Sequence, residues 1–433
     1  MRVLMFAYAC DPYRGSESAA GWGLSRAVAS FADAVVLHGP DHRDNMRRWS
    51  AQHPEDPVQY VTVDEPSWCG VANRSRIGRF LSYVAWMRRA GRVAVNLHRE
   101  RPFDAVHHAT YATYWLPSPV RALEAPSVWG PVGGAVSTPL RLWSALGWRG
   151  LPTEILDLVA VRVASWLPAT RRTWRAADVR LLLNPETRRR LSSPSRETTE
   201  ILNHVLFLEH ETLPRAPRRG ELLYLSPLEF RKGPRLALLA LARAPGNLRL
   251  RIVGDGPERA RLEALSRRLG LAEQVTFEGW VELDALPRLY AQAEAVVFTG
   301  LREEGGASLA EAMGCGAPVV VLAHGGAATV ASCTTDPSRV RLVEPGSLNQ
   351  TIDRLAGAMS GWPDDAVFAQ GGHLDRASAL RRLESAFEAA IGRAGAQGRR
   401  DGARGGLRDR SASSRSTRVA RRPAGASGDE TEN

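Results

Sequence analysis

The sequence alternates short runs of β-branched and apolar residues with helical segments, and this alternation restricts the fold more than any other feature. The pattern is most regular in the second half, where strands are predicted at residues 222–225, 248–253, 275–278, 295–299 and 318–322. Strands that alternate with helices indicate parallel sheets joined by crossover helices. We therefore predict an α/β chain of two Rossmann-like lobes that face a cleft, with ligands at the carboxyl ends of the strands.

The length and the breaks in the pattern predict the domain organisation. A chain of 433 residues is too long for one domain of roughly 100–200 residues. Pro214 and Pro217 lie in a charged stretch between the halves, and Gly371-Gly372 precedes the last helical segment. We predict a first lobe at residues 1–200, a linker at 201–220 and a second lobe at 221–373. A helix at 374–392, able to pack back on the first lobe, and a disordered Arg/Gly/Ser-rich tail at 393–433 would follow.

The charge and cysteine content exclude several classes of protein. The net charge is +11, but residues 393–433 hold ten Arg against five acidic residues, and no aromatic-and-basic RNA motif is present. We therefore expect no nucleic-acid partner. The four cysteines form no C-x-x-C pair, which argues against a zinc site or a disulfide framework. No apolar run approaches the length of about 18 residues that a membrane span needs. A cytoplasmic location is expected.

Two stretches of the first half combine apolar and tryptophan residues with arginine. Residues 76–101 place Phe80 and Leu81 among arginines, and residues 141–175 contain Trp148 and three further tryptophans. Both stretches would suit an anionic membrane surface, where Trp favours the interface and Arg the headgroups. The alternative is that both are helices packed on a sheet, with their arginines in water. Peripheral attachment to the inner face of the membrane stays open.

The strongest local pattern is the sequence REEGGASLAE at residues 302–311, between a predicted buried strand and a helix. Gly305 and Gly306 allow close backbone approach, and the helix N-terminus that follows offers N–H groups to an anion. Glu303 and Glu311 lie eight residues apart, so both can point toward one ligand. Carboxylates that accept two hydroxyl hydrogen bonds hold sugars and riboses in this way. The alternative is a surface loop followed by a capped helix.

Lys232 is the only lysine among 57 basic residues, and it lies between a predicted strand and a predicted helix. A compact ammonium group on a flexible stem suits a phosphate contact where the planar guanidinium of Arg does not fit. The alternative is that this lysine survived by chance in a chain whose composition strongly favours arginine.

Together these patterns resemble the family-4 retaining glycosyltransferases, which have the GT-B fold. The second half resembles the family's donor lobe in the order and spacing of residues 253–257, 275–279 and 303–318, and Glu303 and Glu311 match its E-x7-E pair. The first half resembles the acceptor lobe through ACDP with GSE at residues 9–17, DAVHH at 104–108 and WGPVGG at 129–134. The resemblance covers about residues 1–392, which is all but the tail.

The resemblance implies a role in donor binding for each matched residue of the second half. Glu303 would hold the hydroxyls of the transferred sugar, and Glu311 would hold the ribose. Lys232 would neutralise the diphosphate leaving group, where negative charge develops. The backbone N–H groups of three residues would meet the distal phosphate and the sugar: Gly306, Ala307 and Ser308.

The remaining matched residues would complete the cleft. Gly15 would let the first loop approach the phosphates or the acceptor. Either His107 or His108 would reach the reacting sugar, and the alternative for each is a packed histidine at a strand end. Three residues would border the base: Gly279, Trp280 and Val281.

One departure from the family affects donor binding. The family has a Gly-Arg pair before its Lys-Gly, and that Arg shares the diphosphate with the Lys, whereas this chain has Ser226-Pro227. A charge-assisted hydrogen bond contributes roughly 1.5–3 kcal/mol, so its loss would weaken donor binding on the order of 10–100-fold. Arg231 would compensate only if its side chain reached the same face.

The resemblance implies a retaining glycosyltransferase that moves a hexose-type sugar from a UDP- or GDP-sugar to a glycan, lipid-linked or small-molecule acceptor. The sequence has no DxD motif and no His, Asp or Glu cluster at metal-ligand spacing, so we predict transfer without a metal or other cofactor. Two alternatives remain: a degenerate GT-B scaffold with weak or no donor binding, and an enzyme similar to nucleotide-sugar 2-epimerases.

Overall fold

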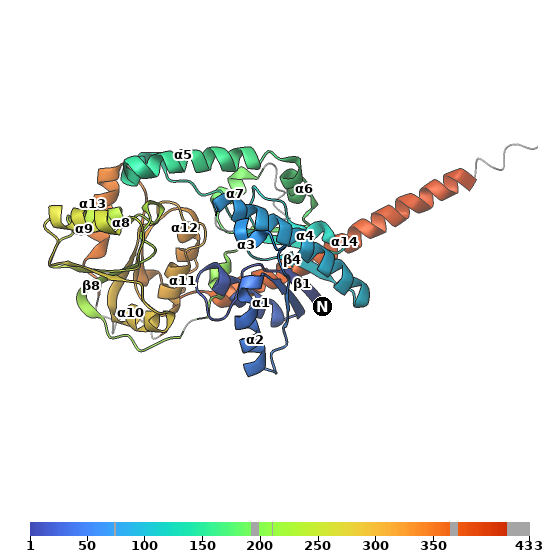
Figure 1. The fold of residues 1–433 in the computed structure, drawn as a ribbon, viewed down its shortest axis with the longest axis horizontal. Coiled ribbons are helices and arrows are strands. Elements are labelled where there is room, and N and C mark those ends of the chain that lie inside the picture. Colours follow the sequence, from blue (N-terminus) through green and yellow to red (C-terminus); the bar gives the residue numbers. More distant parts are fainter. Residues whose placement is uncertain (73–74, 192–198, 210, 364–370, 414–433) are drawn as a thin grey trace, which may run out of the picture.

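The computed structural model describes residues 1–72, 75–191, 199–209, 211–363 and 371–413, which form two α/β lobes (Figure 1). Every strand pair in both sheets is parallel. The first sheet has the order β3 (Gln59–Thr62), β2 (Asp33–His38), β1 (Arg2–Phe6), β4 (Ala105–His108), β5 (Ser127–Val132), β6 (Val179–Leu182) and β7 (Thr199–Ile201). The second has the order β10 (Val275–Gly279), β9 (Arg249–Val253), β8 (Arg218–Leu225), β11 (Ala293–Phe298), β12 (Val319–Leu322) and β13 (Val340–Val343). The prediction of two Rossmann-like lobes is confirmed.

Helices cover both faces of each sheet, which explains why the central strands are continuous apolar runs. All four residues of β12 are buried, and β1 is buried from its second residue, Val3, onward. The first-half helices are α1 (Glu17–Ala29), α2 (Arg43–Gln52), α3 (Cys69–Ala72), α4 (Arg76–Glu100), α5 (Gly147–Ala164), α6 (Pro168–Ala176) and α7 (Pro185–Arg190). Those of the second half are α8 (Pro234–Leu241), α9 (Arg259–Arg268), α10 (Leu286–Gln292), α11 (Ala307–Gly314), α12 (Gly325–Ala331), α13 (Leu348–Met359) and α14 (Arg376–Ser413).

The strand order of each sheet reverses once, between β1 and β4 in the first lobe and between β8 and β11 in the second. In a parallel sheet the loops at the carboxyl ends of the strands that flank such a point leave a crevice between them. The loops after β1, β8 and β11 contain Gly15, Lys232 and Glu303 respectively. The topology therefore places the predicted donor-binding residues at the two crevices.

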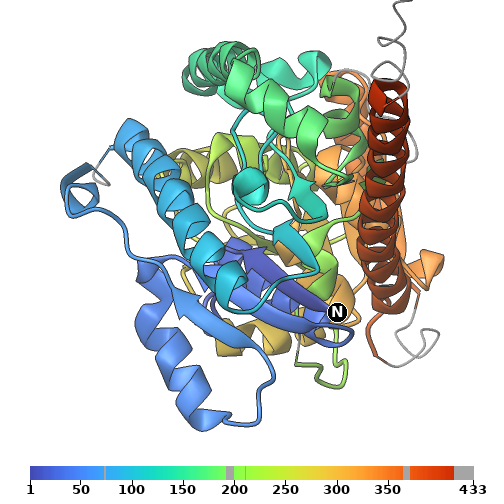
Figure 2. The same ribbon diagram turned by 90° about the vertical axis from the view of Figure 1, so that its right-hand side faces the viewer.

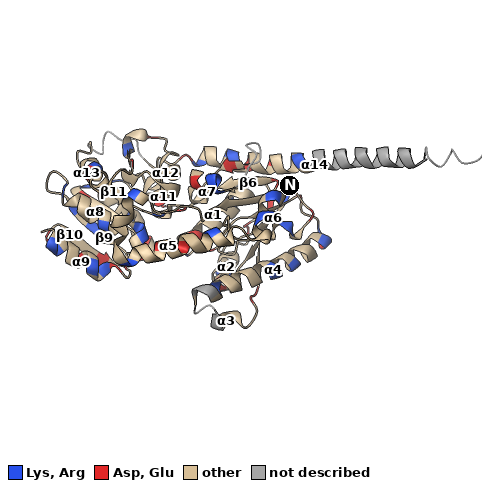
Figure 3. Ribbon diagram, turned by 90° about the horizontal axis from the view of Figure 1, so that it is seen from above, with Lys and Arg blue, Asp and Glu red and all other residues tan. Residues whose placement is uncertain are grey.

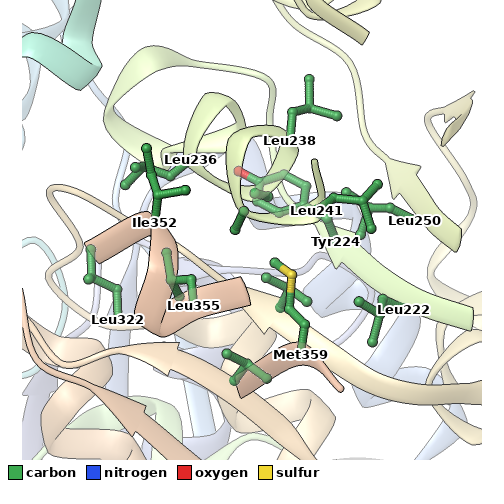
Figure 4. Packing of buried hydrophobic residues seen from close by; sticks show 14 of the residues in the cluster. Leu222, Tyr224, Leu236, Leu238, Leu241, Leu250, Leu322, Ile352, Leu355 and Met359 are labelled. Atoms are coloured by element: carbon green, nitrogen blue, oxygen red, sulfur yellow. The ribbon is translucent and has the colours of Figure 1, made fainter. Parts of the chain in front are cut away.

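One segment of the first half of the chain packs in the second lobe. The 3-10 helix Leu140–Leu146 lies in the first half of the chain, but Leu142, Ala145 and Leu146 are buried in the core of the second lobe. Figure 4 shows the part of this core around Leu222, Leu236 and Leu355. Residues 1–200 are therefore not one lobe, because this segment crosses to the other lobe and returns through α5.

The predicted linker at residues 201–220 contains a buried turn and the start of a strand. The 3-10 helix His204–Phe207 is buried and packs against α1, and β8 already begins at Arg218. Val205, Leu206 and Phe207 belong to this buried turn. Pro214 and Pro217, on which the linker prediction rests, follow it in the sequence.

Helix α14 returns to the first lobe, where Ala379, Leu383 and Phe387 are fully buried in the same core as strand β1 (Figure 2). The helix runs from Arg376 to Ser413, and its last part extends away from both lobes (Figure 1). The rest of the predicted tail, residues 414–433, lies outside the described residues.

Replacing the buried Phe387 tests whether α14 is part of the first-lobe core. Phe387→Ala would leave a cavity beside His107, whose ring lies 5.3 Å from the Phe387 ring. We expect a loss of about 3–5 kcal/mol in the free energy of unfolding, measured by urea denaturation. The exposed neighbour Glu388 provides the control, and Glu388→Ala should change stability by less than about 0.5 kcal/mol. Similar small losses for both variants would contradict the placement of α14.

Candidate active site between the two lobes

A pocket of about 540 Å³ lies between the lobes, where the carboxyl ends of the two sheets face each other. Its walls come from the loop after β1, the loop after β8, and the segment that leads into α11. Eight of the twelve predicted site residues line it: Gly15, Lys232, Trp280, Val281, Glu303, Ala307, Ser308 and Glu311. The sequence patterns thus identify one contiguous site from both halves of the chain.

Lys232 and Glu303 form an ion pair inside this pocket. Both side chains are mostly buried, and the Tyr224 hydroxyl donates a 2.9 Å hydrogen bond to the Lys232 carbonyl. Burial alone would raise the pKa of Glu303, but the Lys232 ammonium group, Arg231 and the Gly306 N–H together hold it below its usual range. Glu303 is therefore ionised, and it holds the Lys232 ammonium group in the pocket.

The start of α11 forms the wall opposite Lys232. Gly306 precedes the helix with a left-handed φ of 83°, which glycine adopts without strain. Its N–H donates to a Glu303 carboxylate oxygen at 3.2 Å, so this group already has a partner. Gly306 does not line the pocket, whereas Ala307 and Ser308 do. The first N–H groups of a helix lack intrahelical acceptors, so these two residues offer donors to an anion.

Glu311 lies one turn into α11, and its carboxylate accepts a 3.0 Å hydrogen bond from the Tyr290 hydroxyl. Burial raises its pKa above the usual range, and the Tyr290 hydrogen bond opposes this only in part. The other carboxylate oxygen has no hydrogen-bond partner among the described residues. Glu311 therefore offers an acceptor to a ligand in the pocket.

The residues predicted to border the base divide into two kinds. Trp280 and Val281 line the pocket, and the Trp280 side chain is 73% exposed. Gly279 does not line it. Its carbonyl accepts a 2.7 Å hydrogen bond from the Gly254 N–H, and its φ of 78° turns the chain so that the next two residues reach the pocket.

The structure brings neither predicted histidine into the pocket. His107 is fully buried, and its Nε2 lies 2.6 Å from the Gly130 carbonyl. His108 is buried between the Tyr83 hydroxyl and the Ser118 hydroxyl, each 2.9 Å away. Burial lowers the pKa of His107 to about 4 and that of His108 to about 3, so both rings are neutral. His107 and His108 are the last two residues of the central strand β4. Both therefore match the alternative stated above, a packed histidine at a strand end.

Arg231 adds a second cation to the wall of the pocket. Ser226 and Pro227 line the pocket without offering a cation, but Arg231 lines it beside Lys232. Its carbonyl accepts the N–H groups of Leu301 and Arg302 at 2.9 and 3.0 Å, which fixes its backbone against the loop after β11. Arg231, which lies in the 3-10 helix Phe230–Lys232, therefore reaches the pocket wall, and its guanidinium group also pairs with Glu229.

The loop of residues 302–305 joins the lobes through side chains that the sequence patterns did not identify. The Glu304 carboxylate accepts hydrogen bonds from the Val136 N–H at 2.8 Å and from the Asn184 side chain at 3.0 Å, both in the first lobe. Arg302 pairs with Glu154 at 3.0 Å and with Asp157 at 2.9 Å, both on α5. The run of charged residues at 302–304 was visible, but its partners lie about 120–170 residues away in sequence and carry no pattern of their own.

A second pocket, of about 590 Å³, lies on the α5 side of the same loop. It shares Arg231 and Glu303 with the first pocket. Its remaining walls come from α5 and from the first-lobe segments around Trp115 and Val136. Two ligands bound in the two pockets would therefore meet at Glu303.

In the described part of the chain, no group of three or more His, Cys, Asp or Glu side chains is placed to hold a metal ion. Metal-independent transfer remains a prediction.

Removing the Lys232 ammonium group should change how stability depends on pH. In the wild type, the lowered pKa of Glu303 means that the pair stabilises the fold above the carboxyl pKa of the unfolded chain and loses this effect as the pH falls. In Lys232→Met the burial of Glu303 would instead raise its pKa. Protonation of Glu303 on acidification would then remove the free-energy cost of a buried, unpaired carboxylate. We expect Lys232→Met to lower the free energy of unfolding by about 3–5 kcal/mol at pH 7, measured by urea denaturation. The difference from the wild type should be smaller at about pH 5.

The double variant Glu303→Gln with Lys232→Met is the control, since it buries no carboxylate. Its stability relative to wild type should not recover on acidification. A gap between wild type and Lys232→Met that stays constant over this pH range would contradict the ion pair.

A family model for group 1 glycosyl transferases matches residues 208–371. This range is almost the whole second lobe, with strands β8 to β13, and it contains Lys232, Glu303 and Glu311.

Curated relatives match parts of the chain. An uncharacterized glycosyltransferase of Methanocaldococcus jannaschii is 32% identical over 143 residues, which are 33% of this chain and 36% of that protein. A 2-deoxystreptamine N-acetyl-D-glucosaminyltransferase of Streptomyces fradiae is 40% identical over 83 residues, 19% of this chain and 20% of that protein. A D-inositol 3-phosphate glycosyltransferase of Mycobacterium marinum is 30% identical over 180 residues, 40% of this chain and 36% of that protein. The matches thus span about a third or less of the relatives' length.

Solved structures match over nearly the whole chain at low sequence identity. The lipopolysaccharide outer core galactosyltransferase WaaB has a TM-score of 0.53 at 15% identity, over 89% of this chain and 99% of that one. Anabaena HepE, in complex with UDP and glucose, has a TM-score of 0.51 at 16% identity, over 90% and 99%. Sucrose-phosphate synthase from Thermosynechococcus elongatus has a TM-score of 0.52 at 17% identity, over 93% and 99%. The second lobe is therefore similar to the group 1 glycosyl transferases, and the chain that carries it has the two-lobed GT-B fold.

Proposed function

We propose that this chain is a glycosyltransferase that moves a hexose-type sugar from a UDP- or GDP-sugar to an acceptor hydroxyl, with retention of anomeric configuration and without a metal. One observation carries the proposal: Lys232, Glu303, Glu311 and the start of α11 line a single pocket between the lobes. This pocket offers a cation and helix N–H groups for a diphosphate, and carboxylates for sugar and ribose hydroxyls.

The site residues divide the work of the transfer. The bond between the sugar C1 and the diphosphate oxygen breaks, and a bond from C1 to the acceptor oxygen forms on the same face. The acceptor proton passes to the leaving phosphate oxygen, so the protein needs no histidine base. Lys232, Arg231 and the N–H groups of Ala307 and Ser308 would stabilise the charge that develops on the diphosphate.

The Lys232–Glu303 pair gives donor binding a specific consequence. In this structure the ammonium group and the carboxylate neutralise each other. A bound diphosphate would compete for the Lys232 ammonium group, and the released Glu303 carboxylate would accept the sugar hydroxyls. Binding of the two halves of the donor is therefore coupled, and a nucleotide without sugar would leave the Glu303 carboxylate without its Lys232 partner, held only by the Gly306 N–H.

Nucleotide binding is the first test. At 100 times its dissociation constant, a nucleotide should add about 2.7 kcal/mol to stability, seen as a thermal shift. UDP is the first choice, since UDP is bound in the HepE structure that shares this fold, and GDP is tested beside it. Lys232→Ala should abolish most of the shift, whereas Arg267→Ala, an exposed cation of the same lobe, should retain it. No shift with either nucleotide, in a protein that unfolds cooperatively, would favour the degenerate scaffold.

Trp280 provides a second, independent test of the base site. Because its side chain is exposed beside the pocket, its loss should not disturb the fold. Stacking of a base on an aromatic ring contributes about 1–3 kcal/mol, so Trp280→Ala should weaken nucleotide binding roughly 5–150-fold by calorimetry. Trp166→Ala, which removes an exposed tryptophan far from the pocket in sequence, is the matched control. Equal affinities for the two variants would place the base elsewhere.

Transfer itself distinguishes the remaining alternatives. We expect sugar transfer from a UDP- or GDP-sugar to proceed at its full rate in EDTA, and the product's anomeric configuration, read by NMR, to equal that of the donor. Strict dependence on an added divalent ion would contradict the metal-independent mechanism. Product formation without any acceptor would instead favour the epimerase-like alternative.

A further inference from the structure

Helix α5 has the reverse of the usual distribution of polar and apolar residues. Its two carboxylates, Glu154 and Asp157, are buried. Its exposed residues are mostly apolar, and Leu156 and Val163 are 68% and 62% exposed. A surface helix of a protein in water normally turns its apolar stripe inward.

The exposed apolar residues form one continuous stripe, named here the α5 stripe: Trp148, Ile155, Leu156, Val159, Val163, Trp166 and Leu167. They recur at spacings of three, four and seven residues, which place them on one side of the helix. Figure 1 shows α5 as an outer helix that runs from the second lobe to the first. No described helix is both long and apolar enough to cross a bilayer, so the α5 stripe suits a helix that lies on a surface.

Along its own segment of the chain, the exposed charges near the α5 stripe all have one sign, and Glu258 of the second lobe shares a pocket with Trp148 at one end. From residue 140 to residue 176, a fully described segment, the only acidic residues are the buried Glu154 and Asp157. The exposed charged residues are arginines: Arg141, Arg149, Arg162, Arg171, Arg172 and Arg175. In Figure 3 the charged positions of α6 are likewise blue. Exposed apolar residues among cations match an anionic lipid surface.

The polar side of α5 is fixed by the active-site loop. Arg302, next to Glu303, pairs with both buried carboxylates of the helix, and the Glu154 carboxylate also accepts the Thr138 N–H at 2.9 Å. Turning the helix to bury the stripe would break these bonds. The ion pairs with Arg302 therefore fix the orientation of α5 and keep the stripe exposed.

The second pocket opens beside the α5 stripe. Val159 and Val163 belong to both the stripe and the pocket wall, and Arg231 and Glu303 form the end that joins the donor pocket. Arg162 and Arg190 line the pocket, and neither has an ion-pair partner within the described residues. The pocket thus has an apolar entrance, free cations, and direct access to the site of transfer.

We propose that this second pocket binds an acceptor that is a membrane-borne amphiphile with a phosphate group, and that the α5 stripe lies on the anionic bilayer that supplies it. Arg162 and Arg190 would hold the acceptor phosphate. The apolar chain would leave past Val159 and Val163 into the bilayer, and the acceptor hydroxyl would lie near Glu303. This inference rests on the proposed function for the reaction, but membrane binding and phosphate recognition are measured without it.

Vesicle sedimentation tests the α5 stripe with the 433-residue chain. We expect strong binding to vesicles of phosphatidylcholine and phosphatidylglycerol and weak binding to phosphatidylcholine alone. The triple variant Trp148→Ser, Leu156→Ser and Trp166→Ser should reduce binding at least about tenfold. Leu342→Ser, which removes an exposed apolar residue of the second lobe, should bind like the wild type. Because all four residues are exposed, these variants should fold.

Three outcomes would overturn the membrane assignment. They are equal binding to both vesicle types, unchanged binding of the triple variant, and a wild-type dimer in sedimentation equilibrium that the triple variant dissolves. The last would mean that a second copy of the chain covers the stripe. The UDP thermal shift is measured on the same triple variant. A retained shift with lost vesicle binding separates failure of this inference from failure of donor binding.

Dodecyl phosphate, below its micelle concentration, tests the second pocket by calorimetry. We expect it to bind more tightly than either inorganic phosphate or dodecyl maltoside, since only dodecyl phosphate has both features. Arg162→Ser with Arg190→Ser should weaken its binding roughly 25-fold, taking about fivefold for each cation. Arg88→Ser with Arg89→Ser, which removes two exposed cations of α4, is the control. Equal affinities for the two double variants would overturn the phosphate assignment, and equal binding of dodecyl maltoside would show that the pocket recognises only the apolar chain.

Discussion

The loop of residues 302–305 fixes the two lobes, the donor pocket and helix α5 in one arrangement. Arg302 pairs with the carboxylates of α5, Glu303 with Lys232, and Glu304 with backbone and side-chain donors of the first lobe. The Gly305 carbonyl accepts a 2.9 Å hydrogen bond from Asn203. Each successive residue therefore contacts a different part of the molecule. Buried charged groups are costly unless they are paired, so each of these contacts limits where the others can lie.

The parallel lobes were predictable because their strands are continuous apolar runs that end in turn residues, as in the fully buried β12. The lobe in which each segment packs was not predictable, because tertiary contacts decide burial and a local sequence pattern does not contain them. Leu142 and Leu146 read as first-half residues but pack in the second lobe.

The donor side of the site was predictable because its residues lie next to strand ends and helix starts, as Lys232 and Glu303 do. Sequence could not separate the histidines, because a strand-end His is equally compatible with a cleft and with a core. It also could not find Glu304, whose partners Val136 and Asn184 are distant in sequence. The direction of the Arg231 side chain depends on a 3-10 turn that no spacing rule specifies.

Because the segment Leu140–Leu146 packs in the second lobe, the two lobes cannot be separated by one cut in the linker. Many two-lobed proteins are treated as modules that recombine at the linker, yet here a cut near residue 208 would leave the second lobe without Leu142, Ala145 and Leu146. The gap would expose apolar residues of α13 to water and favour aggregation. A chimaera that takes its donor lobe from this chain would need residues 140–146 as well, supplied from the other side of the junction.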